Sequence, residues 1–292
     1  MVMSLSVEVL GLDYKENMLY LMTLTWNACD KLTKLKESLL PALNGLDYTW
    51  LIKDNASNDD TVKVASEWGD NVKVFPYKDN RQNFSAGMNY LFAEASPKDS
   101  DLVLLLNNDV IINDKDSIKN MIDVISKDDK VGAVGSRLLY TDTDKLQHAG
   151  VVFEEQYYLP THFRANEKSD SNAEKDREFQ VVTGAVLLTK GEYFRNAFEG
   201  NASGVKGMDE KYHWAFDDVD FCLSIKYNME KKIIYCGKTN IFHEESASLK
   251  KNPANKLFMS HNVNYLRTKW SKRYITDKKL YEQNPTYNLY RK

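Results

Sequence analysis

The stretch LVLLLNND, residues 102–109, contains the most apolar strand that the sequence predicts, and three polar residues close it. A short aliphatic run between polar neighbours is typical of a strand that is buried on both faces. Strands of this kind occur in parallel sheets, where helices connect one strand to the next. The stretch therefore predicts an α/β fold with a mostly parallel central sheet flanked by helices.

The residues before this stretch alternate between strand-like and helix-like patterns. Leucines recur at helical spacing from Leu32 to Leu43, which predicts a helix over 30–43 with Asp30 as its N-cap. Strands that such helices connect run parallel in right-handed units. The predicted strands are 19–26, 48–52, 72–75 and 102–106, and the other predicted helices are 59–68 and 85–95.

The second half of the chain has a less regular pattern. The polar stretch 154–178 is expected to be a loop, and a strand is expected over 180–189. Because no Pro-, Gly- or Ser-rich linker divides the chain, we expect one domain over 1–249 and a C-terminal helical tail over 250–292. Strands are also expected over 232–236 and 239–242, and helices over 217–228 and 254–272.

Composition and charge exclude several classes of protein. The 292 residues carry 39 basic and 42 acidic side chains, a net charge of -3, which argues against a general polybasic coat for nucleic acid. Three widely spaced cysteines (Cys29, Cys222 and Cys236) fit a reducing compartment better than a disulfide framework. No apolar run approaches the roughly 20 residues that cross a bilayer, and no signal-peptide pattern opens the chain. These features predict a cytoplasmic protein, with attachment to the inner membrane surface as a variant.

Polar side chains follow three of the predicted strands. Asn27 follows the first, the segment 54–57 (DNAS) follows the second, and 107–109 (NND) follows the strand quoted above. In open α/β sheets the ligand crevice lies at the carboxyl ends of the strands. We therefore expect these polar residues to face one pocket.

Acidic residues and a histidine suggest what chemistry that pocket performs. Asp109 is either a carboxylate that ends a strand or a ligand for a hard divalent cation, which prefers carboxylate and phosphate oxygen. The run Asp217 to Asp220 (DDVD) suits the first turn of a helix, where carboxylates complement the dipole. Two adjacent carboxylates also raise one another's pKa, as a general base requires. His243 is either structural or a ligand.

Taken together, these motifs resemble family-2 glycosyltransferases of the GT-A fold, and most of all the rhamnosyl- and galactofuranosyl-transferase-like branch. The matching motifs occur in the same order as in the family over residues 21–248, and this shared order is the basis of the resemblance. Two departures are a single acidic residue in the metal motif and aspartate in place of the commoner glutamate at 217. The matching segments are Thr25-Trp26-Asn27, Asp54 to Ser57, Asn83 to Asn89, Leu106 to Asp109, Gln147 to Gly150, Thr183 to Ala185, Asp217 to Asp220, and His243.

The resemblance implies a nucleotide-diphosphate sugar as donor, most naturally a UDP- or dTDP-sugar. It implies that Asp109 and His243 hold Mn²⁺ or Mg²⁺ on the diphosphate. The metal would then stabilise the charge that develops on the leaving group. The implied donor-binding residues are Thr25, Asn27, Asp54, Asn83, Asn107 and Asn108.

The same resemblance implies an inverting transfer to a hydroxyl of an acceptor. Asp218, with Asp217 beside it, would be the catalytic base that deprotonates this hydroxyl. Trp214 and His148 would line the acceptor side of the pocket. The acceptor stays open among a saccharide, a lipid-linked saccharide and a modified DNA base.

The tail leaves three interpretations open. From residue 250 on it carries a net charge of +9, interleaved with tyrosines and a tryptophan. It is a solvated helix face, a patch that lies on an anionic membrane, or a track for a nucleic-acid backbone.

Two other functions compete with transfer. A sugar nucleotidyltransferase uses a similar sheet and Mg²⁺, but its G-x-G-x-R loop is absent from this sequence. A non-catalytic carbohydrate- or nucleic-acid-binding module would leave the carboxylates without a role.

Overall fold

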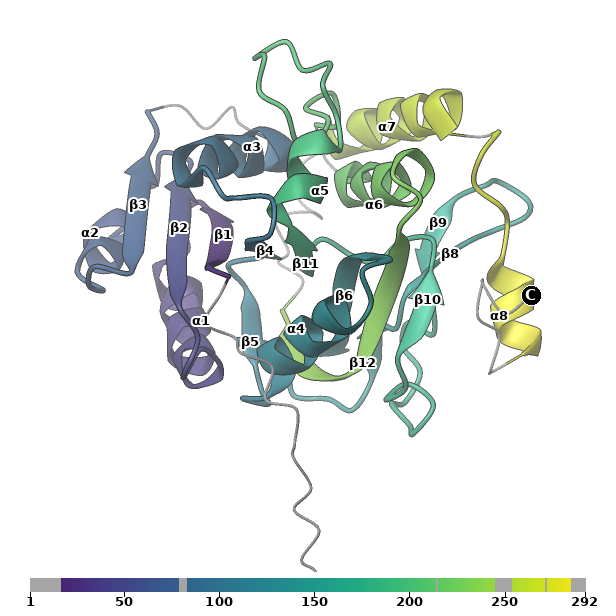
Figure 1. Ribbon diagram of the computed structural model, residues 1–292, viewed down its shortest axis with the longest axis horizontal. Helices are drawn as coiled ribbons and strands as arrows, with labels where there is room; N and C mark the ends of the chain where they lie inside the picture. Colours follow the sequence, from purple (N-terminus) through teal and green to yellow (C-terminus); the bar gives the residue numbers. More distant parts are fainter. Residues whose placement is uncertain (1–16, 79–82, 214, 245–253, 271, 285–292) are drawn as a thin grey trace, which may run out of the picture.

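A mixed sheet runs through the middle of the molecule, and helices lie on both sides of it (Figure 1). The computed structural model describes residues 17–78, 83–213, 215–244, 254–270 and 272–284. The ends of the elements in the first half differ from their predicted positions by at most two residues. These elements are β1 (Leu19–Thr25), α1 (Cys29–Ala42), β2 (Tyr48–Asp54), α2 (Thr61–Ser66), β3 (Val72–Pro76), α3 (Phe84–Ala95) and β4 (Leu102–Leu106).

The second half contains many short strands, and its helices α5 (Gly191–Asn196), α6 (Asp217–Asn228) and α7 (Ala254–Trp270) lie near one another at the top of Figure 1. Its strands are β5 (Val110–Ile112), β6 (Val131–Tyr140), β7 (Leu146–His148), β8 (Val151–Phe153), β9 (Pro160–His162), β10 (Arg177–Phe179), β11 (Val186–Lys190) and β12 (Lys232–His243). Its helices are α4 (Ser117–Lys127), α5 (Gly191–Asn196), α6 (Asp217–Asn228), α7 (Ala254–Trp270) and α8 (Lys278–Gln283).

The strand order explains both the regular and the irregular part. It is β10-β12-β6-β11-β4-β1-β2-β3, with β5 paired to β12 and β7 to β6. The neighbours β4, β1, β2 and β3 are parallel, as are β6 and β12. Between these two parallel groups lies β11, which is antiparallel to both β4 and β6. The predicted α/β class with a mostly parallel sheet is confirmed.

The structure corrects the predicted start of α1. Its N-cap residue is Ala28, and Asp30 lies inside the first turn without capping the helix by its side chain. A carboxylate at this place still complements the positive end of the helix dipole.

Three predictions for the second half are also wrong. The expected loop 154–178 contains β9 and the start of β10, and the two strands expected over 232–236 and 239–242 form the single strand β12. A register shift between Cys236 and Ile241 hides that continuity in the sequence. The strand expected over 180–189 starts only at Val186, because the backbone N–H groups of Thr183 and Gly184 bond to the side chains of His148 and Asp218 and not to the backbone of a neighbouring strand.

Alternate residues of the central strands face two separate cores. Leu104 of β4 packs with α1 and α4 on one side, whereas Leu105 packs with α3, α5 and α6 on the other. This alternation follows from the two-residue period of a strand. Burial on both faces is what the all-aliphatic sequence of β4 predicts.

The C-terminal segment packs against the second of these cores. Trp270 and Tyr274 are 2% and 4% exposed, and Tyr281 of α8 stacks on Phe179 with ring centroids 4.4 Å apart. Most of the apolar surface of these rings is therefore removed from water. The boundary at residues 249 and 250 lies outside the described residues and stays a prediction.

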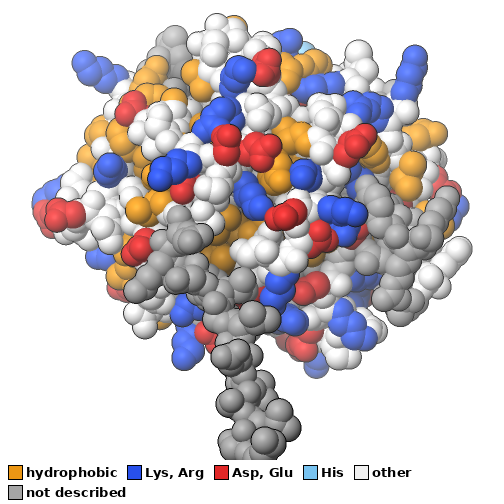
Figure 2. Space-filling model, in the orientation of Figure 1, with side chains coloured by type: hydrophobic (Ala, Val, Ile, Leu, Met, Phe, Trp, Pro, Cys, Tyr) orange, Lys and Arg blue, Asp and Glu red, His pale blue; other side chains and the backbone are white. Residues whose placement is uncertain are grey.

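Charged side chains of both signs intermingle on the face that Figure 2 shows. Several tail cations bond to the body of the protein: Lys269 to Asp209 and Asp220, Lys278 to Glu154, Lys279 to Glu155, Arg267 to Tyr157 and Arg273 to Asn228. In the described part of the chain, no helix combines the length and the apolar character that a membrane span needs.

Candidate functional site

The carboxyl ends of three strands bring predicted donor-binding residues together. Thr25 and Asp54 are register partners in the parallel pair of β1 and β2. Asn108, just beyond β4, donates a hydrogen bond from Nδ2 to Oγ1 of Thr25 at 3.1 Å. Three strands that are distant in sequence thus contribute polar side chains to one edge, as expected for a parallel sheet.

Asp54 and Asn27 shape the turn at this edge. The Asp54 carboxylate is 1% exposed and accepts hydrogen bonds from the backbone N–H of Ser57, at 2.9 Å, and from its hydroxyl. Asn27, in a left-handed conformation with φ 46°, accepts from the N–H of Asn58 at 2.8 Å. Their contact with a nucleotide stays a prediction, but their backbone bonds fix the loop on which a base would rest.

Trp26 belongs to the matching segment Thr25-Trp26-Asn27, but the sequence analysis gave it no binding role. Its ring is 50% exposed directly after β1, between Thr25 and Asn27. A large exposed ring at a polar edge offers a flat apolar surface for a planar ligand. The signal in the sequence was a tryptophan placed at the polar end of an otherwise buried strand.

Asn83 sits at the first turn of α3. Its Oδ1 accepts from the N–H of Ala86 at 2.8 Å and so caps the helix, and its Nδ2 donates to the carbonyl of Glu210 at 2.8 Å. The side chain thereby ties α3 to the loop that precedes α6. Its predicted contact with the donor stays a prediction.

Asp109 and His243, which are 134 positions apart in the sequence, meet in the structure. The antiparallel pairing of β5 with the end of β12 sets Val110 opposite His243. This pairing brings Nε2 of His243 to 3.1 Å from Oδ1 of Asp109. Both side chains are largely buried, and Lys31 lies 4.0 Å from the other carboxylate oxygen.

The contacts of His243 orient its ring for a cation. Nδ1 lies 2.6 Å from Oε1 of Gln147, an oxygen that can only accept, so Nδ1 carries the proton. Nε2 faces Oδ1 of Asp109, with Nδ2 of Asn107 at 3.4 Å, and in the neutral ring it is the nitrogen with the lone pair. A metal-ligating histidine commonly has its other nitrogen fixed in this way.

The pair fits a divalent cation whose other ligands come from a substrate. Among the described residues no group of three or more His, Cys, Asp or Glu side chains could hold a metal. Mg²⁺ and similar ions are often held by one or two protein ligands together with substrate phosphates. Asp109 and His243 could therefore supply two ligands of a site that a diphosphate would complete.

Asp218 lies at the start of α6, where two backbone N–H groups hold its carboxylate. Oδ1 accepts from Val219 at 2.8 Å, and Oδ2 accepts from Gly184 at 2.8 Å. A Cβ at Gly184 would stand 2.9 Å from Cβ of Asp218, so only glycine allows this approach. The two bonds fix the orientation of the carboxylate at the start of α6.

The other two carboxylates of the DDVD run have different surroundings. Burial, and then the charge of Asp218, raise the pKa of Asp217, which also lines the cavity described below. Asp220 is 1% exposed and bonds to Tyr212, Lys269 and Trp270. It therefore joins α6 to α7 and does not face the cavity.

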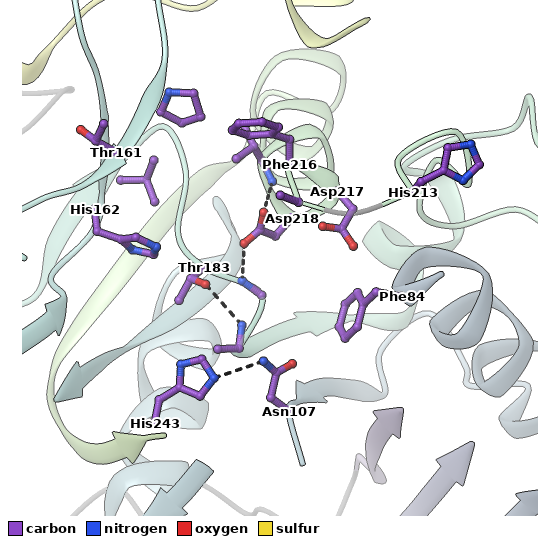
Figure 3. A pocket seen from close by; sticks show the side chains of 16 residues that line it. Phe84, Asn107, Thr161, His162, Thr183, His213, Phe216, Asp217, Asp218 and His243 are labelled. Atoms are coloured by element: carbon purple, nitrogen blue, oxygen red, sulfur yellow. Dashed lines mark hydrogen bonds between the residues drawn. The ribbon is translucent and has the colours of Figure 1, made fainter. Parts of the chain in front are cut away.

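A cavity of about 360 Å³ joins the two halves of the site. Figure 3 shows His243 and Asn107 at one end of it, Asp217 and Asp218 at the other, and Phe84 to one side. His243, which contacts Asp109, and the predicted base Asp218 thus line the same space from a strand and a helix of the second half.

The acceptor-side predictions have different outcomes. His148 is fully buried behind the cavity wall, where it contacts His162, and His162 itself lines the cavity. Trp214 lies outside the described residues. Apart from His162, sequence reasoning also missed His213 and Phe216 as lining residues, because long-range packing alone brings them here.

The family model for glycosyl transferase family 2 matches residues 21–190. This chain belongs to glycosyltransferase family 2. The O-antigen chain rhamnosyltransferase RfbN of Salmonella typhimurium is 26% identical over 199 residues, which are 67% of this chain and 57% of that protein. The rhamnosyltransferase WbaN of Salmonella anatum is 22% identical over 196 residues, 67% of this chain and 56% of that one. The glycosyltransferase chain thus spans less than two thirds of each relative in these matches.

Solved structures share the fold of this family-2 chain. Staphylococcus aureus TarS 1–349 in complex with UDP-GlcNAc has a TM-score of 0.59 at 12% identity, over 86% of this chain and 66% of that one. The mannosyltransferase PcManGT from Pyrobaculum calidifontis, in complex with GDP-Man and Mn²⁺, has a TM-score of 0.57 at 12% identity, over 88% and 65%. The predicted GT-A fold is confirmed.

Proposed function

We propose that this protein is an inverting, metal-dependent glycosyltransferase that moves a sugar from a nucleotide-diphosphate donor to an acceptor hydroxyl. One observation carries the proposal: His243, whose Nε2 contacts Asp109, and the Asp218 carboxylate line one cavity. A cation-binding pair and a base on opposite sides of one space is the arrangement that in-line displacement requires.

The donor is proposed to lie along the carboxyl ends of β1, β2 and β4. Thr25, Asn27 and Asp54 would receive the nucleoside, and Asn107 and Asn108 the diphosphate, which would lie next to Asp109. Structural neighbours were solved with UDP-GlcNAc and with GDP-Man and Mn²⁺, which supports a nucleotide sugar here. A UDP- or dTDP-sugar is the donor class that we propose.

Asp109 and His243 would hold a Mn²⁺ or Mg²⁺ ion on the donor diphosphate. Such an ion, when bound, neutralises the charge that develops on the leaving nucleoside diphosphate. The protein's part is to fix the two ligands before the donor arrives. Gln147 fixes one of them, because its Oε1 accepts a hydrogen bond from Nδ1–H of His243.

Asp218 is proposed to take the proton from the acceptor hydroxyl. The freed oxygen then bonds to the anomeric carbon as the bond from that carbon to the diphosphate oxygen breaks. Because attack and departure occur on opposite faces, the anomeric configuration inverts. Asp217, whose pKa is raised by burial and by Asp218, would keep a proton more readily and so limit repulsion beside the base.

A saccharide, free or lipid-linked, is the acceptor class that we propose. The two curated relatives are O-antigen chain rhamnosyltransferases, which supports a glycan acceptor. Several tail cations bond to the body of the protein, which favours a docked helix over a nucleic-acid track. The proposed location is the cytoplasm, at the inner membrane surface when the acceptor is lipid-linked.

A panel of nucleotide sugars with Mn²⁺ tests the proposal. We expect release of nucleoside diphosphate that rises when a glycoside acceptor is added and stops with excess chelator. In a parallel reaction with a nucleoside triphosphate and a sugar 1-phosphate, release of pyrophosphate would identify a nucleotidyltransferase. Binding of donor without any turnover across the panel would identify a non-catalytic module.

A further inference from the structure

Two histidines that are 14 positions apart contact each other beside the proposed active site. Nδ1 of His148 lies 2.8 Å from Nδ1 of His162, and the two rings are nearly perpendicular, at 85°. His148 is fully buried at the end of β7, whereas His162 is exposed at the end of β9 and lines the cavity that contains Asp218. One ring therefore lies behind the wall, and the other, labelled His162 in Figure 3, lies on it.

The backbone sets the direction of the hydrogen bond between the rings. The N–H of Thr183 can only donate, and it lies 3.4 Å from Nε2 of His148, so Nε2 accepts. Burial, with the nearby imidazoles of His162 and His243, holds the pKa of His148 well below its usual range, so its ring is neutral. A neutral ring that accepts at Nε2 carries its proton at Nδ1.

The proton on His148 fixes the state of the second ring. Nδ1–H of His148 donates to Nδ1 of His162, which must then accept. A neutral His162 consequently carries its proton on Nε2. Its ring lines the cavity, so this nitrogen is the donor that the ring can offer to a ligand there.

One dipeptide links this pair of rings to the proposed base. The N–H of Thr183 holds His148, and the next N–H, that of Gly184, holds Oδ2 of Asp218 at 2.8 Å. The same turn thus orients the ring pair and the carboxylate. A ligand that bonds to His162 would therefore be held at a fixed position relative to Asp218.

We propose that His148 and His162 form a relay that presents Nε2–H of His162 to an oxygen of a saccharide acceptor, next to the hydroxyl that Asp218 deprotonates. His162 would be a binding residue for the acceptor, and His148 the positioning residue that fixes its tautomer. This inference rests on the proposed function, because it concerns the acceptor of that reaction. Because Asp218 accepts a hydrogen bond and His162 donates one, the two residues together would select the orientation in which a saccharide ring binds.

Imidazole NMR tests the relay without any need for turnover. In ¹⁵N-labelled protein at neutral pH we expect the proton of His148 on Nδ1 and that of His162 on Nε2. Addition of methyl α-L-rhamnopyranoside, β-D-galactopyranoside or α-D-mannopyranoside at high concentration should shift the His162 signal. A proton on Nε2 of His148, or no shift of His162 with any of the three glycosides, would overturn the inference.

Kinetics of variants provide the second test, with the best glycoside acceptor of the same set. His162→Ala should raise the acceptor KM about tenfold, the cost of one hydrogen bond, while the donor KM changes less than about twofold. His162→Gln should restore the acceptor KM, because its amide can place N–H near the position of Nε2. The exposed His261 does not line the cavity, and His261→Ala serves as the control.

The role of His148, which lies behind the cavity wall, is tested in the same way. His148→Asn keeps a donor close to Nδ1 and should retain the acceptor KM, whereas His148→Ala should raise it as His162→Ala does. An equal loss in donor and acceptor KM for His162→Ala would mean a structural role and contradict the relay. If the wild type transfers to no acceptor while the tautomers and glycoside shifts are as expected, the proposed transfer fails and the relay does not.

Discussion

The proposed donor edge and the proposed acceptor side of the cavity are built in different ways. The donor side consists of strand ends in a regular parallel sheet, where β1, β2 and β4 each carry polar residues directly after an apolar run. The acceptor side combines short antiparallel strands, the start of α6 and packing from α7 and α8. Its contacts join residues far apart, such as Gly184 with Asp218.

The two sides therefore depend on different sequence information: the strand ends on local patterns, and the acceptor side on contacts between distant segments. A strand end and the polar residue that follows it can be recognised in a window of ten residues. The hydrogen bond that holds Asp218, and the indole that holds the third carboxylate of the same helix, come from segments tens of positions away. Substitutions on the acceptor side should therefore reduce transfer without weakening donor binding. Substitutions in the C-terminal tail should destabilise the acceptor side.

The largest effect is expected from Asp218→Asn. The amide cannot take a proton, so transfer should fall about 10³–10⁴-fold, within the range that general bases contribute. Nucleotide binding, measured by calorimetry with UDP or dTDP and Mn²⁺, should change less than about threefold. Asp217→Asn is the matched comparison and should reduce transfer much less. Full transfer by Asp218→Asn would remove this residue as the base.

The next effect is on stability. Trp270→Ala removes a ring that is 2% exposed and an indole N–H that bonds to Asp220 at 2.6 Å. We expect the free energy of unfolding to fall by about 3–5 kcal/mol, measured by urea titration. Leu280→Ala, at a side chain 42% exposed in α8, should cost little and is the control. If Trp270→Ala had no effect, the tail would not be part of the acceptor side.

His243→Ala tests the cation-binding pair on the donor side. Loss of one of two protein ligands should raise the Mn²⁺ concentration for half-maximal activity by about 100-fold, the upper end of what loss of supporting groups costs. The unfolding free energy without metal should change much less. His261→Ala is again the control, and a Mn²⁺ titration identical to that of the wild type would show that His243 is no ligand.

The smallest effect concerns pH. Burial raises the pKa of Asp277 to about 6, although it accepts bonds from Phe153 and Gln180. Because the folded state prefers the neutral form, its contribution to stability is complete below about pH 4 and declines as the pH rises through 6. Asp277→Asn should remove about 2 kcal/mol of this decline between pH 4 and 7.

Urea titrations at several pH values measure that slope. Asp129→Asn, at a fully exposed carboxylate, is the control. The charge of the nearby Lys226 lowers the pKa of Asp277 and so opposes burial. The difference in slope between wild type and Asp277→Asn therefore reports the net of these two effects. A slope equal to that of the wild type would show that Asp277 keeps an ordinary pKa in the fold.

The sequence predicted the first half well because its signals are local. The ranges of β1 to β4 and the helices between them agree to within two residues. The meeting of Asp109 with His243 followed only from a family resemblance, since 134 positions separate them. The extent of β11, the two strands in the expected loop and the exposed His162 depended on contacts that no local pattern contains.

The central claim is that Asp218 acts on the face of the donor opposite the diphosphate that Asp109 and His243 would hold. The anomeric configuration of the first product tests it most directly. Proton NMR of the newly formed glycosidic bond, with a donor of known anomer, should show the inverted configuration. A product that retains the configuration of the donor would contradict the account.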